Sequence, residues 1–260
     1  SLNKEFGELT KVKTIGTSNQ VKITTKYRIK EDNVEVGSIV EAKLFNGLKP
    51  FFTKKITIDD FSVKNQEVGL LSSQKVGPTV AKDIVINAIW AVFFSLIAIF
   101  IYIAVRFRKW QYGLGGLISL AHDAFITLSL YSFFYGVLPF TLEIDQTFIA
   151  AILTIIGYSI NDTVIIFDRI REYVGLHPKR DLKDNMNDAM NSTLGRTLNT
   201  SGTTLAVLLA IFLFGGEVIQ GFVFAMLIGV LVGTYSSVFN ATPVAYDMIN
   251  IFKSKKEKVQ

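Results

Sequence analysis

Residues 84–105 read IVINAIWAVFFSLIAIFIYIAV and contain no charged side chain. Residues 218–246, VIQGFVFAMLIGVLVGTYSSVFNATPVAY, contain none either. About 20 predominantly apolar residues are enough to cross the hydrocarbon core of a bilayer, roughly 30 Å thick, as a helix. Two such runs in one chain indicate an integral membrane protein.

Three further stretches between these runs have the length and apolar content of membrane-spanning helices. The sequence therefore predicts five transmembrane helices, in residues 82–105, 113–135, 146–167, 194–214 and 218–246. The last of these is long enough to be tilted or to have an interfacial end. The predicted fold class is an α-helical polytopic membrane protein with a helical membrane domain at residues 80–250.

Positively charged residues are distributed unevenly over the connections. They follow the first, third and fifth predicted helices: Arg106, Arg108, Lys109; Arg169, Arg171, Lys179, Arg180, Lys183; Lys253, Lys255, Lys256 and Lys258. The connections at residues 136–145 and 215–217 contain no Lys or Arg. Because positively charged loops stay in the cytoplasm, we expect a multi-pass membrane protein with these basic connections on the cytoplasmic side. Its basic tail, residues 251–260, would be cytoplasmic, and the odd number of helices would place the N-terminal region outside.

The first 79 residues have the pattern of a small soluble domain. Apolar residues alternate with others in residues 21–29 and 56–63, which predicts strands, and recur at helical spacing in residues 34–45. We therefore expect an extracytoplasmic α+β domain at residues 1–79, with Gly77-Pro78 at its end. The chain begins without an apolar signal segment, so we also expect it to continue a longer protein that supplies an upstream membrane helix.

Residues 168–197 form the longest predicted cytoplasmic piece. In it, apolar residues recur at helical spacing opposite charged ones: Leu182, Met186, Ala189, Met190 and Leu194. This pattern predicts an amphipathic helix at the membrane surface. Such a helix is either a plain connector or a contact for a cytoplasmic partner.

Several function classes find no support in the residues. The chain has no cysteine, so disulfides and cysteine-ligated metal sites are excluded. It contains no P-loop, no nucleophile–base arrangement, and its two histidines lack metal-ligand spacing. The net charge of +5 fits basic cytoplasmic loops better than nucleic acid. We expect no enzyme activity, no catalytic residue, no metal site and no nucleic-acid partner.

The fifth predicted helix carries a stripe of small residues at four-residue intervals: Gly221, Ala225, Gly229, Gly233, Ser237 and Ala241. Apolar helices in lipid associate through close packing, which small residues allow. We expect another helix to lie along this stripe. The contact is either static packing or a seam along which a helix pair slides.

Ionisable residues inside the predicted spans are the candidates for chemistry. A charge there costs about 2.5–3.5 kcal/mol on insertion scales and marks a functional site by default. Asp162 lies in the third predicted helix, Arg196 begins the fourth, and Asp123 lies in the second beside His122. If a rearrangement changed the distance between Asp162 and Arg196, the proton affinity of Asp162 would change with it. The alternative is a fixed ion pair that locks two helices.

Each of these charges lies among other polar residues of its helix, which we expect to face the interior of the bundle. The supporting residues that we predict are Asn161, Thr163, Thr200, Thr203, Thr204, Asp123 and Ser119.

Residues 157–172, GYSINDTVIIFDRIRE, resemble a helix signature of the SecF family of bacterial protein-export subunits. Four further stretches resemble that family in the same order: residues 76–80 (VGPTV), 120–123 (LAHD), 193–204 (TLGRTLNTSGTT) and 214–216 (FGG) with the small-residue stripe. The resemblance covers roughly residues 70–250.

The resemblance implies an RND-superfamily bundle and a ferredoxin-like fold for the N-terminal domain. It implies that the protein works with SecD, possibly fused in the same chain, to help to pull unfolded preprotein from the SecYEG channel. The transported H⁺ or Na⁺ would drive this work, with no other cofactor. The family's ion-coupling Asp and Arg would correspond to Asp162 and Arg196.

Two other function classes stay open. One is an RND-type ion-driven exporter of small molecules or lipids, although the short outer connections at residues 136–145 and 215–217 disfavour it. The other is a purely structural assembly subunit of the membrane, in which Asp162 and Arg196 hold helices together.

Overall fold

The computed structural model describes residues 1–8, 10–15, 20–31, 35–53, 55–62, 69–71, 73, 78–138, 140 and 142–257. The chain divides into two compact units, Ser1–Ile86 and Asn87–Gln260. The division falls inside a helix. The predicted junction at Gly77-Pro78 lies partly outside the described residues, because Gly77 is not among them.

The first unit contains short helices and one strand pair. In chain order these elements are α1 (Leu2–Phe6), β1 (Lys11–Ile15), β2 (Gln20–Thr24), α2 (Glu35–Leu48), the 3₁₀ turn η1 (Lys49–Phe51) and α3 (Ile58–Ser62). The strands are antiparallel, with Lys11 opposite Thr24 and Ile15 opposite Gln20. Phe6, Phe45 and Phe61 pack into a small apolar core.

The structure corrects two secondary-structure predictions in this unit. The strand expected over residues 21–29 ends at Thr24, and residues 27–30 form a turn. The other correction concerns the second predicted strand. Residues 58–62 form helix α3 and not part of a strand. Thr57 starts the helix: its amide and its hydroxyl both donate to Asp60 Oδ2, and the amide of Asp60 donates back to Thr57 Oγ1. This reciprocal capping favours a helix over the strand that alternation predicts. The side-chain hydrogen bond from Thr57 holds the pKa of Asp60 below its usual value.

The α+β content of this unit does not identify its fold. Its described residues contain a single two-stranded sheet. A ferredoxin-like arrangement therefore stays a prediction.

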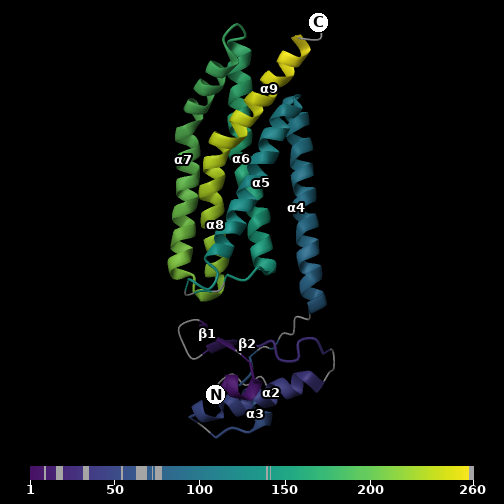
Figure 1. Cartoon of the computed structure of the whole chain (residues 1–260). Coiled ribbons are helices and arrows are strands. Elements are labelled where there is room, and N and C mark those ends of the chain that lie inside the picture. Colours follow the sequence, from purple (N-terminus) through teal and green to yellow (C-terminus); the bar gives the residue numbers. More distant parts are fainter. Residues whose placement is uncertain are drawn as a thin grey trace. The chain divides into compact units, whose positions relative to one another are not determined.

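The second unit is a bundle of long helices (Figure 1). These are α4 (Pro78–Phe107), which crosses the division between the units, α5 (Trp110–Phe133), α6 (Gln146–Leu176), α7 (Leu182–Phe214), α8 (Glu217–Ser236), the π-helical turn η2 (Ser237–Ala241) and α9 (Thr242–Glu257). Within the described residues, five helical stretches are long and apolar enough to cross a membrane. The last runs through α8, η2 and α9.

Three of the helical stretches extend well beyond their predicted ends, and the last of them continues through α9 to Glu257 instead of ending at residue 246. α6 continues to Leu176, and α7 begins at Leu182 and has 33 residues. The segment expected as a separate surface helix is therefore the first part of α7. The side chain of Asp181 caps α7 by accepting from the amide of Lys183, and Met186 and Ala189 are buried. Because these buried residues continue the packed face of α7, nothing in this segment interrupts the helix.

Helix α6 lies at the centre of the bundle, in contact with α5, α7 and α8. The apolar core around it has two parts. One surrounds Ile155, Ile156 and Val230, and the other surrounds Ile103, Phe167 and Ala245. A tight turn at Gly216, with a φ of 81° that favours glycine, reverses the chain between α7 and α8.

Candidate functional site

Asp162 is buried in the middle of α6, with 2% of its surface exposed. Its Oδ2 accepts a hydrogen bond of 3.3 Å from Ser201 Oγ of α7. Thr234 Oγ1 of α8 lies 2.7 Å from the same Ser201 Oγ and 2.7 Å from the carbonyl oxygen of Val230. The hydroxyl group of Ser201 therefore contacts this carboxyl group, and Thr234 of a third helix contacts Ser201.

Both Arg196 and Asp162 are described residues, and no guanidinium nitrogen of Arg196 lies within 4.0 Å of a carboxylate oxygen of Asp162. The two side chains therefore form no direct ion pair. Arg196 is an exposed residue of α7. The alternative of a fixed ion pair between the two side chains thus has no counterpart in this structure.

The polar stripe predicted on α7 lies elsewhere than expected. Thr203 is exposed, and the hydroxyls of Thr200, Thr203 and Thr204 donate to carbonyl groups of their own helix. Of these three, Thr204 also contacts α6, because its Oγ1 accepts a hydrogen bond of 3.2 Å from Tyr158. The buried face of α7 instead carries Thr193, Thr197, Ser201 and Leu208. A threonine whose hydroxyl bonds to its own helix can face outward at little cost, so its presence does not identify the inner face.

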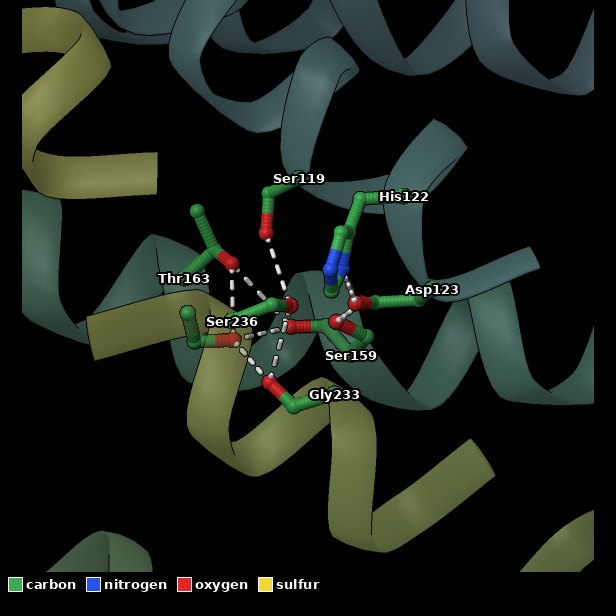
Figure 2. Close-up of polar contacts among 8 residues, drawn as sticks. Ser119, His122, Asp123, Ser159, Thr163, Gly233 and Ser236 are labelled. Atoms are coloured by element: carbon green, nitrogen blue, oxygen red, sulfur yellow. Dashed lines mark hydrogen bonds and ion pairs between the residues drawn. The ribbon is translucent and has the colours of Figure 1, made fainter. Parts of the chain in front are cut away.

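Asp123 of α5 is the second buried carboxylate of the bundle, with no exposed surface. Figure 2 shows it between two partners: Ser159 Oγ of α6 donates to Oδ2 at 2.7 Å, and His122 Nδ1 lies 3.2 Å from Oδ1. The side chain of His122 is about one-third exposed. Asp123 therefore links two helices through a hydroxyl group and reaches the surface of the bundle through an imidazole.

A cluster of hydroxyl groups lies to one side of Asp123 and Ser159 (Figure 2). Ser119 and Ser236 lie 2.9 Å apart, and Thr163 Oγ1 donates to Ser237 Oγ at 3.0 Å. Ser237 is also within hydrogen-bond distance of the carbonyl oxygens of Gly233 (2.8 Å) and Ser159 (3.3 Å). Predicted residues Ser119, Thr163 and Asp123 thus lie together, whereas Asn161 is exposed.

Sequence reasoning missed four residues of these networks: Ser159, Ser201, Thr234 and Ser236. The available signals were weak, because serine and threonine are common in membrane helices. Ser159 lies three residues before Asp162 and thus near it on the helix surface. Ser201 and Thr234 have no comparable signal in the sequence.

The small-residue stripe of α8 is buried along its whole length, from Gly221 to Ala241. A Cβ atom at Gly229 would collide with Ile155 of α6. A Cβ atom at Gly233 would lie 3.0 Å from Ser159 Cβ and 3.5 Å from Asp123 Oδ2. The stripe therefore lets α8 approach α6 closely, beside the Asp123 carboxylate.

The stripe ends at the π-helical turn η2, Ser237–Ala241. Pro243 follows it and has no backbone N–H to donate to the carbonyl of Phe239. A π turn is an irregularity that often occurs at functional sites in helices. It adjoins the hydroxyl cluster because Ser237 belongs to both.

The two networks consist of carboxylate and hydroxyl oxygens, with the imidazole of His122 at the edge of one of them. Over the part of the chain that the structure describes, no group of three or more His, Cys, Asp or Glu side chains is placed to hold a metal ion.

Comparison with known proteins identifies similar chains. Residues 57–251 match the family model described as "Protein export membrane protein SecD/SecF, C-terminal". The protein translocase subunit SecF of Rhodothermus marinus is 51% identical over 66% of this chain and 56% of its own length. SecF of Vibrio alginolyticus is 36% identical over 93% of this chain and 69% of its own length.

A solved structure is similar as well. The crystal structure of SecDF from Thermus thermophilus, described as a translocon-associated membrane protein, matches with a TM-score of 0.62 and 38% identity. The match covers 71% of this chain and 25% of that one. This chain spans about half the length of several curated relatives, for example 54% of SecF from Haemophilus influenzae.

Proposed function

The chain belongs to the SecD/SecF family of protein-export membrane proteins, and on that basis we propose that it couples an ion motive force to protein export. In this proposal it acts as the SecF subunit of the Sec machinery in the bacterial cytoplasmic membrane. The transported ion is H⁺ or Na⁺, and no other cofactor takes part.

One observation carries the proposal at the level of residues: Asp162 is buried in a spanning helix without an ion-pair partner within reach. An unpaired charge inside a membrane protein costs several kcal/mol, about 2.5–3.5 on insertion scales. A carboxyl group in this position gains free energy by binding a proton or a cation when no counter-charge is near. Its ion occupancy therefore depends on where the nearest positive charge lies.

Arg196 supplies that positive charge from the neighbouring helix. A movement of α7 relative to α6 would bring the guanidinium nearer to Asp162 or take it further away. Approach of the guanidinium favours the ionised carboxylate and releases the bound ion, and withdrawal has the opposite effect. An ion that binds from one side of the membrane and leaves to the other would thus drive a cycle of helix movement.

The remaining assignments follow from the family and from loop charge. We place the C-terminus in the cytoplasm and the N-terminal unit outside, because Lys and Arg concentrate on one set of loops. The proposed partners are SecD, SecYEG, unfolded preprotein and membrane lipid. We also propose that SecD covers the exposed face of α7 around Arg196, since a guanidinium facing lipid is costly.

The experiment that tests the proposal measures preprotein translocation into vesicles that contain the complete SecD–SecF complex and SecYEG. It compares wild type with Asp162→Asn and Arg196→Met, with and without an imposed ion gradient. We expect both variants to assemble and to lose the gradient-dependent part of translocation. Asp184→Asn, which changes an exposed carboxylate of α7, is the matched control and should behave as wild type.

The other function classes predict different results. A structural assembly subunit predicts that Asp162→Asn reduces the amount of complex but leaves its gradient-dependent activity per complex unchanged. An exporter of small molecules or lipids predicts that translocation never depends on this chain. Retention of gradient-dependent translocation in both variants would show that Asp162 and Arg196 do not couple the ion.

A further inference from the structure

Both buried carboxylates connect to the same short stretch of α8. Asp123 accepts from Ser159 of α6, and Asp162 accepts from Ser201 of α7. The Asp123 network reaches α8 at Gly233, Ser236 and Ser237, and the Asp162 network reaches it at Thr234 (Figure 2 shows the first network). Residues 233–237 therefore contact the partners of both carboxylates.

The contact between α8 and Ser159 is tight. A Cβ atom at Gly233 would lie 3.0 Å from Ser159 Cβ and 3.1 Å from Ser159 Oγ. The hydrogen bond to Asp123, 2.7 Å long, fixes the direction of the Ser159 hydroxyl beside Gly233. Loss of this hydrogen bond would free the Ser159 side chain to turn and would change its contact with α8.

The next residue of α8, Thr234, would move with Gly233. Thr234 Oγ1 lies 2.7 Å from Ser201 Oγ, the group that donates to Asp162. The π turn that follows at Ser237–Ala241 interrupts the regular hydrogen-bond ladder of the helix, and helices often bend at such a turn. A displacement at Gly233 therefore reaches the hydroxyl that binds Asp162.

We propose that Asp123 is a positioning residue for Asp162, acting through Ser159, the Gly233–Thr234 segment of α8 and Ser201. Asp123 contributes an acceptor oxygen at a fixed position, and this oxygen keeps α8 against α6. The role of Asp162 itself rests on the proposed function above, but the positions of the two carboxylates are coupled whether or not an ion is transported.

A hydrophobic carbodiimide, dicyclohexylcarbodiimide, tests the coupling directly because it modifies protonated carboxyl groups in apolar surroundings. The rate of Asp162 modification in the purified SecD–SecF complex is measured by mass spectrometry at one fixed pH. In both Thr234→Val and Asp123→Leu, we expect Ser201 to lose the position from which it donates to Asp162. Since a hydrogen bond to the ionised carboxylate disfavours the protonated form, its loss should raise the modification rate of Asp162 at least about threefold.

A conservative variant separates position from charge. Asp123→Asn keeps a carbonyl oxygen as the acceptor for Ser159, so we expect its rate to stay within about twofold of wild type. Thr154→Val and Ser129→Ala remove hydroxyls that bond only to their own helices α6 and α5, and both should match wild type. The double variant Asp123→Leu/Thr234→Val should be no faster than the faster single variant, because both changes act along one path.

Three results overturn the inference: Asp123→Asn as fast as Asp123→Leu, no rate change in Thr234→Val, or an Asp162 that stays unmodified in every variant. Thr234→Val keeps the test informative if Asp123→Leu does not assemble. Failure of the proposed function is recognised separately, by gradient-dependent translocation that survives Asp162→Asn. Such a translocation result would refute ion coupling through Asp162. The inference about Asp123 would still be tested by the modification rates alone.

Discussion

Gly233 of α8 lies directly against Ser159 of α6, so that a Cβ atom added at Gly233 would be 3.0 Å from Ser159 Cβ. A methyl group at this position is accommodated only if its neighbours move by a few tenths of an ångström. The same pair lies beside the buried carboxylate of Asp123, whose Oδ2 accepts from Ser159. Helix packing and the polar network therefore depend on the same two residues.

Gly233→Ala should destabilise the bundle by about 1–3 kcal/mol, the usual cost of overpacking a filled core. Gly202→Ala is the matched control, because nothing lies within 4 Å of a Cβ atom at that helical position. The control should be neutral or slightly stabilising, since alanine favours a helix by about 1 kcal/mol over glycine. Thermal unfolding of the purified complex measures both, and equal melting temperatures for the two variants would refute the close contact.

Ser201→Ala should impair ion coupling although the residue carries no charge. It removes the hydroxyl that donates to Asp162 Oδ2 at 3.3 Å, and a lost hydrogen bond to a charged group costs about 1.5–3 kcal/mol. Thr203→Val changes an exposed hydroxyl that bonds to its own helix and should have little effect. Gradient-dependent translocation per assembled complex compares them, and a larger loss in Thr203→Val would mean that the exposed face of α7 carries the function.

Asn185→Ala should lower stability by about 0.5–1.5 kcal/mol, because it removes a hydrogen bond between the two helices. Asn185 is 1% exposed, and its Nδ2 donates to the carbonyl oxygen of His177, which joins the start of α7 to the end of α6. Asn191→Ala, at an exposed position of the same helix, serves as the control. Limited proteolysis between α6 and α7 should become faster in Asn185→Ala alone.

The ion pairs around Asp168 should contribute little despite their good geometry. Asp168 of α6 binds Arg106 of α4 at 3.1 Å and Arg171 at 2.9 Å, and all three side chains are about 40–50% exposed. Exposed pairs are typically worth about 0–1 kcal/mol and weaken with salt. Arg106→Gln should therefore change the unfolding free energy by less than about 1 kcal/mol at low salt and less still at high salt. A larger effect that is independent of salt would contradict this assignment.

The positions of the membrane helices could be predicted well, because the free energy of inserting a segment is close to a sum over its own residues. Each apolar residue adds a favourable transfer free energy regardless of its neighbours, so charge-free runs such as residues 84–105 identify a span. The prediction was weaker at helix ends. Residues 182–193 are polar enough to leave the membrane, yet they continue α7 because Met186 and Ala189 pack against the bundle.

The partners of the carboxylates could be predicted only in part. Asp162 and Asp123 are recognisable because a charge in an apolar span is rare. The choice of Thr200, Thr203 and Thr204 as partners assumed that Arg196 marks the inner face of α7. Ser201 lies five residues after Arg196, which is about 140° around the helix, and it is Ser201 that contacts Asp162.

The sequence by itself determined which segments cross the membrane, where ionisable groups lie within them, and that α8 carries a stripe of small residues. These properties follow from residues taken one at a time or at a fixed spacing along one helix. Only the tertiary structure decided that Ser159 serves Asp123, that Ser201 serves Asp162, and that both networks meet at residues 233–237. The physical reason is that hydroxyl partners depend on how each helix is rotated about its axis, and that rotation is set by packing against neighbouring helices.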